Sequence, residues 1–248
     1  MAEHFSYQSK LREADGALLS RLERQAEAWL CGEGSETAII ADAMELYTKV
    51  EGKDFPNSIE QTLQTALSTF ATLKDATTPE EVEVIAALSG GGTYIDGGDE
   101  DSYRTWADKR VIDTALTLLK EHPEALMLYN GTPKQNAAFP ETSDRIIISD
   151  AEIKNTKDQL RDLAQKLQEE GPLQGKKSIV LVASPGQFLR LPFYAQNELK
   201  DLNLTLYAHP ASSNGNTLHE AVATELVRLI EYRSTGDLSA EAFPFANT

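Results

Sequence analysis

From about residue 82 onward, the sequence alternates apolar runs with amphipathic helical patterns. Five runs are typical of buried strands: "EVIAALSGGG", "EALMLYNGT", "DRIIISD", "KKSIVLVAS" and "NLTLYAHP". Continuous rather than alternating apolar runs are expected where both faces of a sheet are covered, as in parallel sheets. The alternation therefore predicts an α/β fold: a three-layer sandwich with a mostly parallel sheet and helices on both faces.

The residues before this alternation have helical patterns only. Apolar residues recur at helical spacing in "LLSRLERQAEAWL", "TAIIADAMELYTKV" and "SIEQTLQTALSTFATL", with turns between them. We therefore predict an N-terminal helical appendage over residues 1–80, an α/β domain over residues 81–236 and a C-terminal tail over residues 237–248. The tail is expected to be a surface strap or disordered. The helices are interpreted as a packing appendage, with a partner-binding module as the alternative.

Charge and composition restrict the class of partner. The formal net charge of the 248 residues is −16, which argues against nucleic acid and anionic membranes because both require a basic surface. A local cationic pocket is compatible with this charge. A single cysteine, Cys31, excludes an internal disulfide, and the four histidines show no metal-ligand spacing. With no signal peptide or membrane span in the sequence, we expect a cytoplasmic protein that holds no metal.

Loops at one edge of the predicted sheet are the candidate binding site. Right-handed crossovers place the carboxyl ends of all parallel strands at the same edge, where such sheets bind ligands. Four segments should meet there: "SGGGTYIDGG", "NGTPKQN", "SDAEIKNT" and "SPGQFLR". Gly90, Gly91 and Gly92 allow a backbone to approach a ligand and to offer N–H donors, although they match neither a Walker loop nor the dinucleotide fingerprint. A tight turn is the alternative.

Two of these segments open helices, and capping explains most of their polar residues. Thr156 with Gln159, and Ser184 with Gln187, have the spacing of a capping box. Asn155 is left over in the first segment, and its amide could both donate to and accept from a ligand.

The second segment leaves Arg190 unexplained by capping. One turn beyond the cap, its guanidinium could lie beside the helix N-terminus, where N–H groups and the helix dipole favour an anion. Such a pairing would make a phosphate or carboxylate site. A surface arginine paired with an acid is the alternative.

Catalysis has weak candidates only. His209 ends the fifth strand and is the one histidine expected at the ligand edge, where it could be a general acid or base or a structural residue. Asp96 and the acids at positions 99–101 form an acidic loop, for which solvation is a simpler explanation than a cation site.

In order and spacing, the loops resemble the YdcF/SanA/ElyC-like family of bacterial proteins. The matching residues are Gly90-Gly91-Gly92, Arg110 with Ala115, Asn130-Gly131, the run from Asn155 to Gln159 and the run from Ala183 to Arg190. The resemblance spans Val82 to Tyr232. It implies a Rossmann-like domain with a polar site over the glycine loop, to which Asn130, Gly131, Thr156, Ser184 and Gln187 would contribute. Gln187 stands where the family has histidine, which favours binding over catalysis.

The leading hypothesis is a cytoplasmic YdcF-like protein that binds a nucleotide-type or other anionic small molecule at this edge. Because one cytoplasmic family member resembles an S-adenosylmethionine binder, S-adenosylmethionine is one candidate ligand implied by the resemblance. Two alternatives stay open. One is an enzyme acting on a phosphorylated or adenosyl substrate, with His209 or Asp96 as the acid–base group. The other is an interaction protein that uses the N-terminal helices.

Overall fold

The five predicted strands form one sheet in the computed structural model, which describes residues 2–89, 106–137, 139, 143–212 and 218–246. The strands are β1 (Val84–Ala87), β2 (Leu126–Tyr129), β3 (Ile146–Ile148), β4 (Ser178–Ala183) and β5 (Thr205–Pro210). They lie in the order β3-β2-β1-β4-β5, and every pairing between described strands is parallel. The prediction of an α/β fold with a mostly parallel sheet is confirmed.

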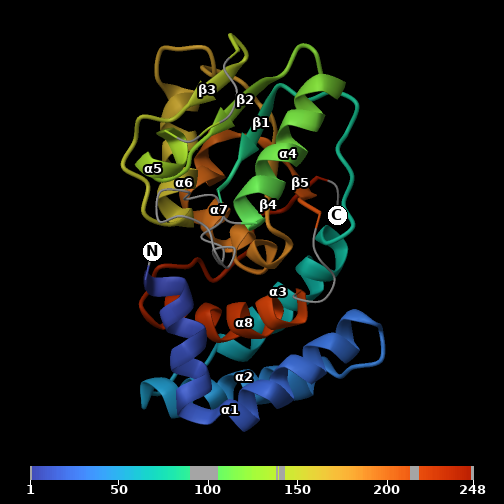
Figure 1. Cartoon of the computed structure of the whole chain (residues 1–248), viewed down its shortest axis with the longest axis vertical. Helices are drawn as coiled ribbons and strands as arrows, with labels where there is room; N and C mark the ends of the chain where they lie inside the picture. Colours follow the sequence, from blue (N-terminus) through green and yellow to red (C-terminus); the bar gives the residue numbers. More distant parts are fainter. Residues whose placement is uncertain (1, 90–105, 138, 140–142, 213–217, 247–248) are drawn as a thin grey trace.

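Helices cover both faces of the sheet, as the apolar strands predicted. On one face, α4 (Trp106–Glu121) packs Val111 and Ala115 against the side chains of Ile85 and Val182 (Figure 1). On the other face, α6 (Thr156–Gln168) and α7 (Leu191–Leu199) belong to a larger core that includes Ala86. The central strands β1, β2 and β4 are buried on both sides, which explains their lack of an alternating pattern, whereas the edge strands β3 and β5 are partly exposed.

The N-terminal helices share this larger core. They are α1 (Ala2–Leu30), α2 (Glu36–Glu51) and α3 (Ile59–Leu73), and they gather with α8 (Leu218–Ser234) at one end of the molecule (Figure 1). The middle of α8, residues 222–230, is buried at nine consecutive positions. A helix buried on all sides lies inside a helical layer. α8 accordingly packs against α1, α2 and α3 and also against the segment that follows β4.

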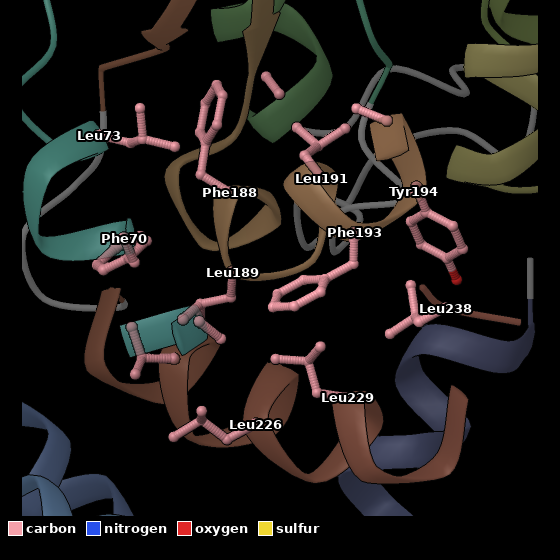
Figure 2. Packing of buried hydrophobic residues seen from close by; sticks show 14 of the residues in the cluster. Phe70, Leu73, Phe188, Leu189, Leu191, Phe193, Tyr194, Leu226, Leu229 and Leu238 are labelled. Carbon is pink, nitrogen blue, oxygen red and sulfur yellow. The ribbon is translucent and has the colours of Figure 1, made fainter. Parts of the chain in front are cut away.

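The segment after β4 differs from its prediction as a single helix. It forms a short 3₁₀ helix, η1 (Pro185–Leu189), and then α7, with Arg190 at the break between them. Pro192 lies in the first turn of α7, where its missing N–H removes no helical hydrogen bond. Figure 2 shows Leu189 and Phe193 pointing toward α8, whereas the Phe188 ring points to the opposite side, where its centroid lies 6.3 Å from that of Phe245.

Two short elements and the C-terminal segment complete the described chain. α5 (Pro133–Ala137) follows β2, and η2 (Lys200–Leu202) precedes β5. Within the tail, Phe243 and Phe245 are buried, and the Ala246 N–H donates to the Leu206 carbonyl at 2.8 Å. As far as residue 246, the tail is a packed strap along β5. None of the described helices is long and apolar enough to cross a membrane.

Candidate functional site

The sheet has a point at which the strand order reverses, between β1 and β4. The chain builds outward from β1 to β2 and β3 and then returns to the other side of β1 for β4 and β5. In open α/β sheets, the carboxyl ends of the strands beside such a reversal leave a crevice where ligands bind. Ser89 follows β1, Ser184 follows β4 and Asn130 follows β2, so these three residues lie at the carboxyl edge around the reversal.

A buried hydrogen-bond network joins the ends of β1 and β2 to α6. The Gln159 side-chain amide donates to the Ser89 carbonyl at 3.1 Å and to the Asn130 carbonyl at 2.9 Å. Ser89 Oγ in turn donates to Gln135 Oε1 at 3.1 Å. Because all four residues are buried, these bonds hold the strand ends in a fixed arrangement.

Asn130 is fully buried, and only half of its amide is satisfied. Its Nδ2 donates to the Gln159 carbonyl at 2.8 Å and to Asp162 Oδ2 at 3.3 Å. Its Oδ1 has no hydrogen-bond partner among the described residues. The donors thus fix the orientation of the side chain and leave one acceptor open.

Gly131 has a packing role next to Asn130. A Cβ at this position would lie 2.8 Å from Gln135 Cβ, and the Gly131 N–H donates to Asn136 Oδ1 at 2.8 Å. A side chain there would collide with the first turn of α5. Close packing therefore accounts for this glycine without a ligand.

One half of the capping box that the spacing predicted forms at the start of η1: the Gln187 side chain bonds the Ser184 N–H, whereas the Gln187 N–H donates to the Ser184 carbonyl at 2.9 Å and not to its hydroxyl. Gln187 Oε1 accepts from the Ser184 N–H at 3.1 Å. Ser184 Oγ is buried and makes no hydrogen bond to the described part of the chain. Gln187 is thus occupied by the helix start, whereas the Ser184 hydroxyl is open.

The start of α6 corrects the assignment of its cap. Asn155 and not Thr156 is the N-cap, and its Oδ1 accepts from the Asp158 N–H at 2.9 Å. Asn155 has extended backbone angles, and it satisfies a free amide of the first turn. Its side chain therefore has a structural role, whereas Thr156 is the first residue of the helix and is buried.

Arg190 is buried and paired with an acid of α8. Its Nη1 donates to Glu225 Oε2, and its Nη2 donates to Thr156 Oγ1 at 3.3 Å. Burial opposes the charge on Arg190, but the Glu225 carboxylate offsets this, and the pKa of the guanidinium is raised above its ordinary value. The Nε atom is buried without a partner among the described residues. Arg190 thus lies at the break between η1 and α7 rather than one turn into a single helix, and its counter-ion is internal.

His209 lies on the other face of the sheet. Its strand partner Val182 belongs to the core under α4, so the imidazole points to that side. His209 Nδ1 is 2.6 Å from Thr78 Oγ1, a hydrogen bond that ties β5 to the chain before β1. Burial lowers the pKa of His209, which Glu121 partly counters.

Some predicted residues lie outside the described part of the chain. Gly90, Gly91, Gly92 and Asp96 fall within residues 90–105, so their prediction as ligand donors or acid–base groups stays a prediction. Among the residues whose placement is described, no group of three or more His, Cys, Asp or Glu side chains could hold a metal ion.

Sequence reasoning missed two residues that organise the site. Gln159 was assigned only a capping role, although it bridges two strand ends. Glu225 was not singled out, yet with Arg228 it occupies buried positions of α8 three residues apart. The sequence does contain a signal for this pair: both residues fall on the apolar face of a helix. Because ionised groups are rarely buried unpaired, charged residues at such positions indicate a buried ion pair.

No family model, characterised protein or solved structure matches this chain. The likeness to the YdcF/SanA/ElyC-like family therefore depends on the short motifs alone. The arrangement of side chains at the carboxyl edge carries the functional argument.

Proposed function

We propose that this chain is a YdcF-like protein that binds a nucleotide-type small molecule at the carboxyl edge of its sheet, beside the β1–β4 reversal. The observation that supports this most is the pair of buried oxygens, Asn130 Oδ1 and Ser184 Oγ, that have no partner among the described residues. Leaving a buried polar atom unsatisfied costs about 1–3 kcal/mol, so native proteins rarely do so without a reason. A bound ligand that donates to these atoms would recover that free energy.

The open atoms favour a ligand with both donors and acceptors. Asn130 Oδ1 can only accept, the Ser184 hydroxyl can donate and accept, and Arg190 Nε can only donate. Nucleosides offer both kinds of group on the base and on the ribose. S-adenosylmethionine stays a candidate on the strength of the family resemblance, and a cytoplasmic location is part of the same proposal.

The anionic part of the sequence-based hypothesis depended on Arg190. Since the structure pairs this guanidinium with Glu225, an anion would have to compete with an internal carboxylate. The proposal therefore rests on the nucleoside-like features of the ligand rather than on its charge.

Replacement of Ser184 by alanine tests the site. We expect a panel of adenosine, AMP and S-adenosylmethionine to include at least one compound that raises the melting temperature of the wild type. In Ser184→Ala, the affinity for that compound should fall roughly tenfold, the effect of one lost hydrogen bond. The unliganded melting temperature should be unchanged, because Ser184 Oγ makes no bond to the described residues.

Ser178→Ala is the matched control. Ser178 begins the same strand at the opposite edge, and its Oγ donates to the Glu81 carbonyl at 3.0 Å. Its replacement should leave the ligand affinity intact. Equal affinities in Ser184→Ala and the wild type would contradict the assigned site.

The two alternatives stay predictions. For the enzyme, the hydrogen bond between His209 and Thr78 favours a structural role for this histidine. For the interaction protein, α1 and α2 pack against α8 within the common core, which favours the packing interpretation of these helices.

A further inference from the structure

The guanidinium of Arg190 is neutralised by a residue from a distant part of the chain. One oxygen of Glu225 accepts from Arg190, and the other lies 3.6 Å from Arg228 Nη1. The side chains of these three residues, here called the charge triad, are each less than a tenth exposed. Attraction between ions withdrawn from water is strong and only weakly screened by salt.

The triad lies where a bound anion would otherwise be expected. Arg190 is the N-cap of α7, and its Nη2 contacts Thr156, the first residue of α6. Helix N-termini attract anions through their free N–H groups and their dipole. At this position the chain supplies its own anion, the carboxylate of Glu225.

Close packing holds Glu225 at Arg190. A Cβ on Gly186 of η1 would lie 3.1 Å from Ala221 Cβ and 3.9 Å from Glu225 Cγ, so η1 and α8 are in direct contact. Atoms packed this closely restrict the rotamers that the Glu225 side chain can adopt. An incoming phosphate would therefore have to break a buried ion pair before reaching Arg190, which is strongly unfavourable.

Among the described residues, the atoms left open at this edge are two oxygens of neutral groups and one guanidinium donor. Asn130 Oδ1 is an acceptor and would be repelled by an anion at close range, whereas the Ser184 hydroxyl has no preference for charge. Arg190 Nε adds a donor, and the Arg190 guanidinium is paired with Glu225, which also lies against Arg228.

We infer that Glu225 sets the charge class of the ligand: the site takes an uncharged nucleoside-type group and excludes phosphate from Arg190. The nucleoside part of this inference rests on the proposed function. The exclusion of phosphate by Glu225 does not depend on it, and inorganic phosphate alone can test it.

The test is calorimetric titration of Glu225→Gln with inorganic phosphate, at constant ionic strength set by sodium chloride. The wild type should show no saturable binding up to the highest phosphate concentration used, whereas Glu225→Gln should bind phosphate with a Kd at least roughly tenfold below that concentration, as expected for a freed charge-assisted hydrogen bond. Glu220→Gln is the matched control, because it removes the same charge from the same helix outside the triad. It should behave as the wild type does.

A second variant controls for the possibility that Glu225→Gln alone destabilises the fold. Glu225→Gln leaves two buried arginines, whereas Glu225→Gln/Arg228→Gln keeps the net charge of the triad at one positive, as in the wild type. The double variant should gain phosphate binding to a similar extent.

Adenosine and AMP give a third comparison: the wild type should bind AMP no more tightly than adenosine, and the variants should prefer AMP by roughly tenfold.

The outcomes separate the two proposals. Saturable phosphate binding by the wild type, or a wild type that prefers AMP tenfold over adenosine, would overturn the role of Glu225. So would folded variants that gain no phosphate affinity. If the variants gain phosphate binding while no chain binds adenosine or AMP, the role of Glu225 holds and the proposed nucleoside site falls.

Discussion

At the scale of single residues, the sequence left Arg190 without a capping role for its side chain, and the structure pairs that side chain with Glu225. Its partner could not be identified, because Glu225 lies 35 residues further along the chain and meets it only through tertiary packing. Asn155 is the opposite case: its place in the sequence suggested no capping role, but in the structure its side chain caps α6. A one-residue shift of the helix start is enough to exchange the roles of Asn155 and Thr156, and such shifts cannot be read from spacing alone.

His209 should make the stability depend on pH. Because burial lowers its folded-state pKa below the ordinary 6.5, the unfolded chain binds more protons between these two pKa values. The stabilisation is complete above about pH 6.5 and is lost as the pH falls toward the folded-state pKa. In urea unfolding from pH 8 to pH 5, the wild type should therefore lose more stability than His209→Gln. Parallel curves for the two proteins would contradict the burial of a neutral imidazole.

At the scale of elements, Arg145 holds the end of α4 against the start of β3. Its Nη1 is shared among the carbonyls of Leu119, His122, Pro123 and Ala125, at 3.0 to 3.3 Å. The last carbonyls of a helix have no partners within the helix, and a cation there also interacts favourably with the dipole. The contact explains how so short a strand as β3 is anchored at the edge of the sheet.

Arg145→Met should lower the free energy of unfolding by about 1–3 kcal/mol, because several carbonyls lose a charged donor. Chemical denaturation gives this value directly. Arg161→Met is a suitable comparison, because Arg161 is an exposed arginine on α6 whose partner Glu198 lies 3.3 Å away. Its loss should cost less than about 1 kcal/mol. Equal costs for the two variants would show that Arg145 does not support α4.

The strands and helices were largely predictable from the sequence, whereas the position at which one helical segment ends and the next begins was less so. Strand runs such as "SIVLVA" have a β-branched, apolar composition that few other structures require, and all five form strands. The division of residues 185–199 at Arg190 was missed, since Pro192 is compatible both with a kinked helix and with a new first turn.

At the scale of the whole molecule, the packing of α8 could not be predicted. Its sequence suggests a helix that closes the α/β domain, but its buried faces meet α1, α2, α3 and η1. Which helix covers which surface depends on contacts far apart in the chain, and no local pattern encodes them. Through η1 and the charge triad, this helical layer reaches the carboxyl edge of the sheet and borders the proposed binding site.

Native mass spectrometry tests the central claim, a ligand site at Ser184 and Asn130, most directly. The wild type, Ser184→Ala and Ser178→Ala would each be incubated with adenosine, AMP and S-adenosylmethionine and then measured without denaturation. We predict a one-to-one adduct with at least one compound on the wild type and on Ser178→Ala, and little or none on Ser184→Ala. The absence of every adduct from the wild type, or equal occupancy of Ser184→Ala, would contradict the account.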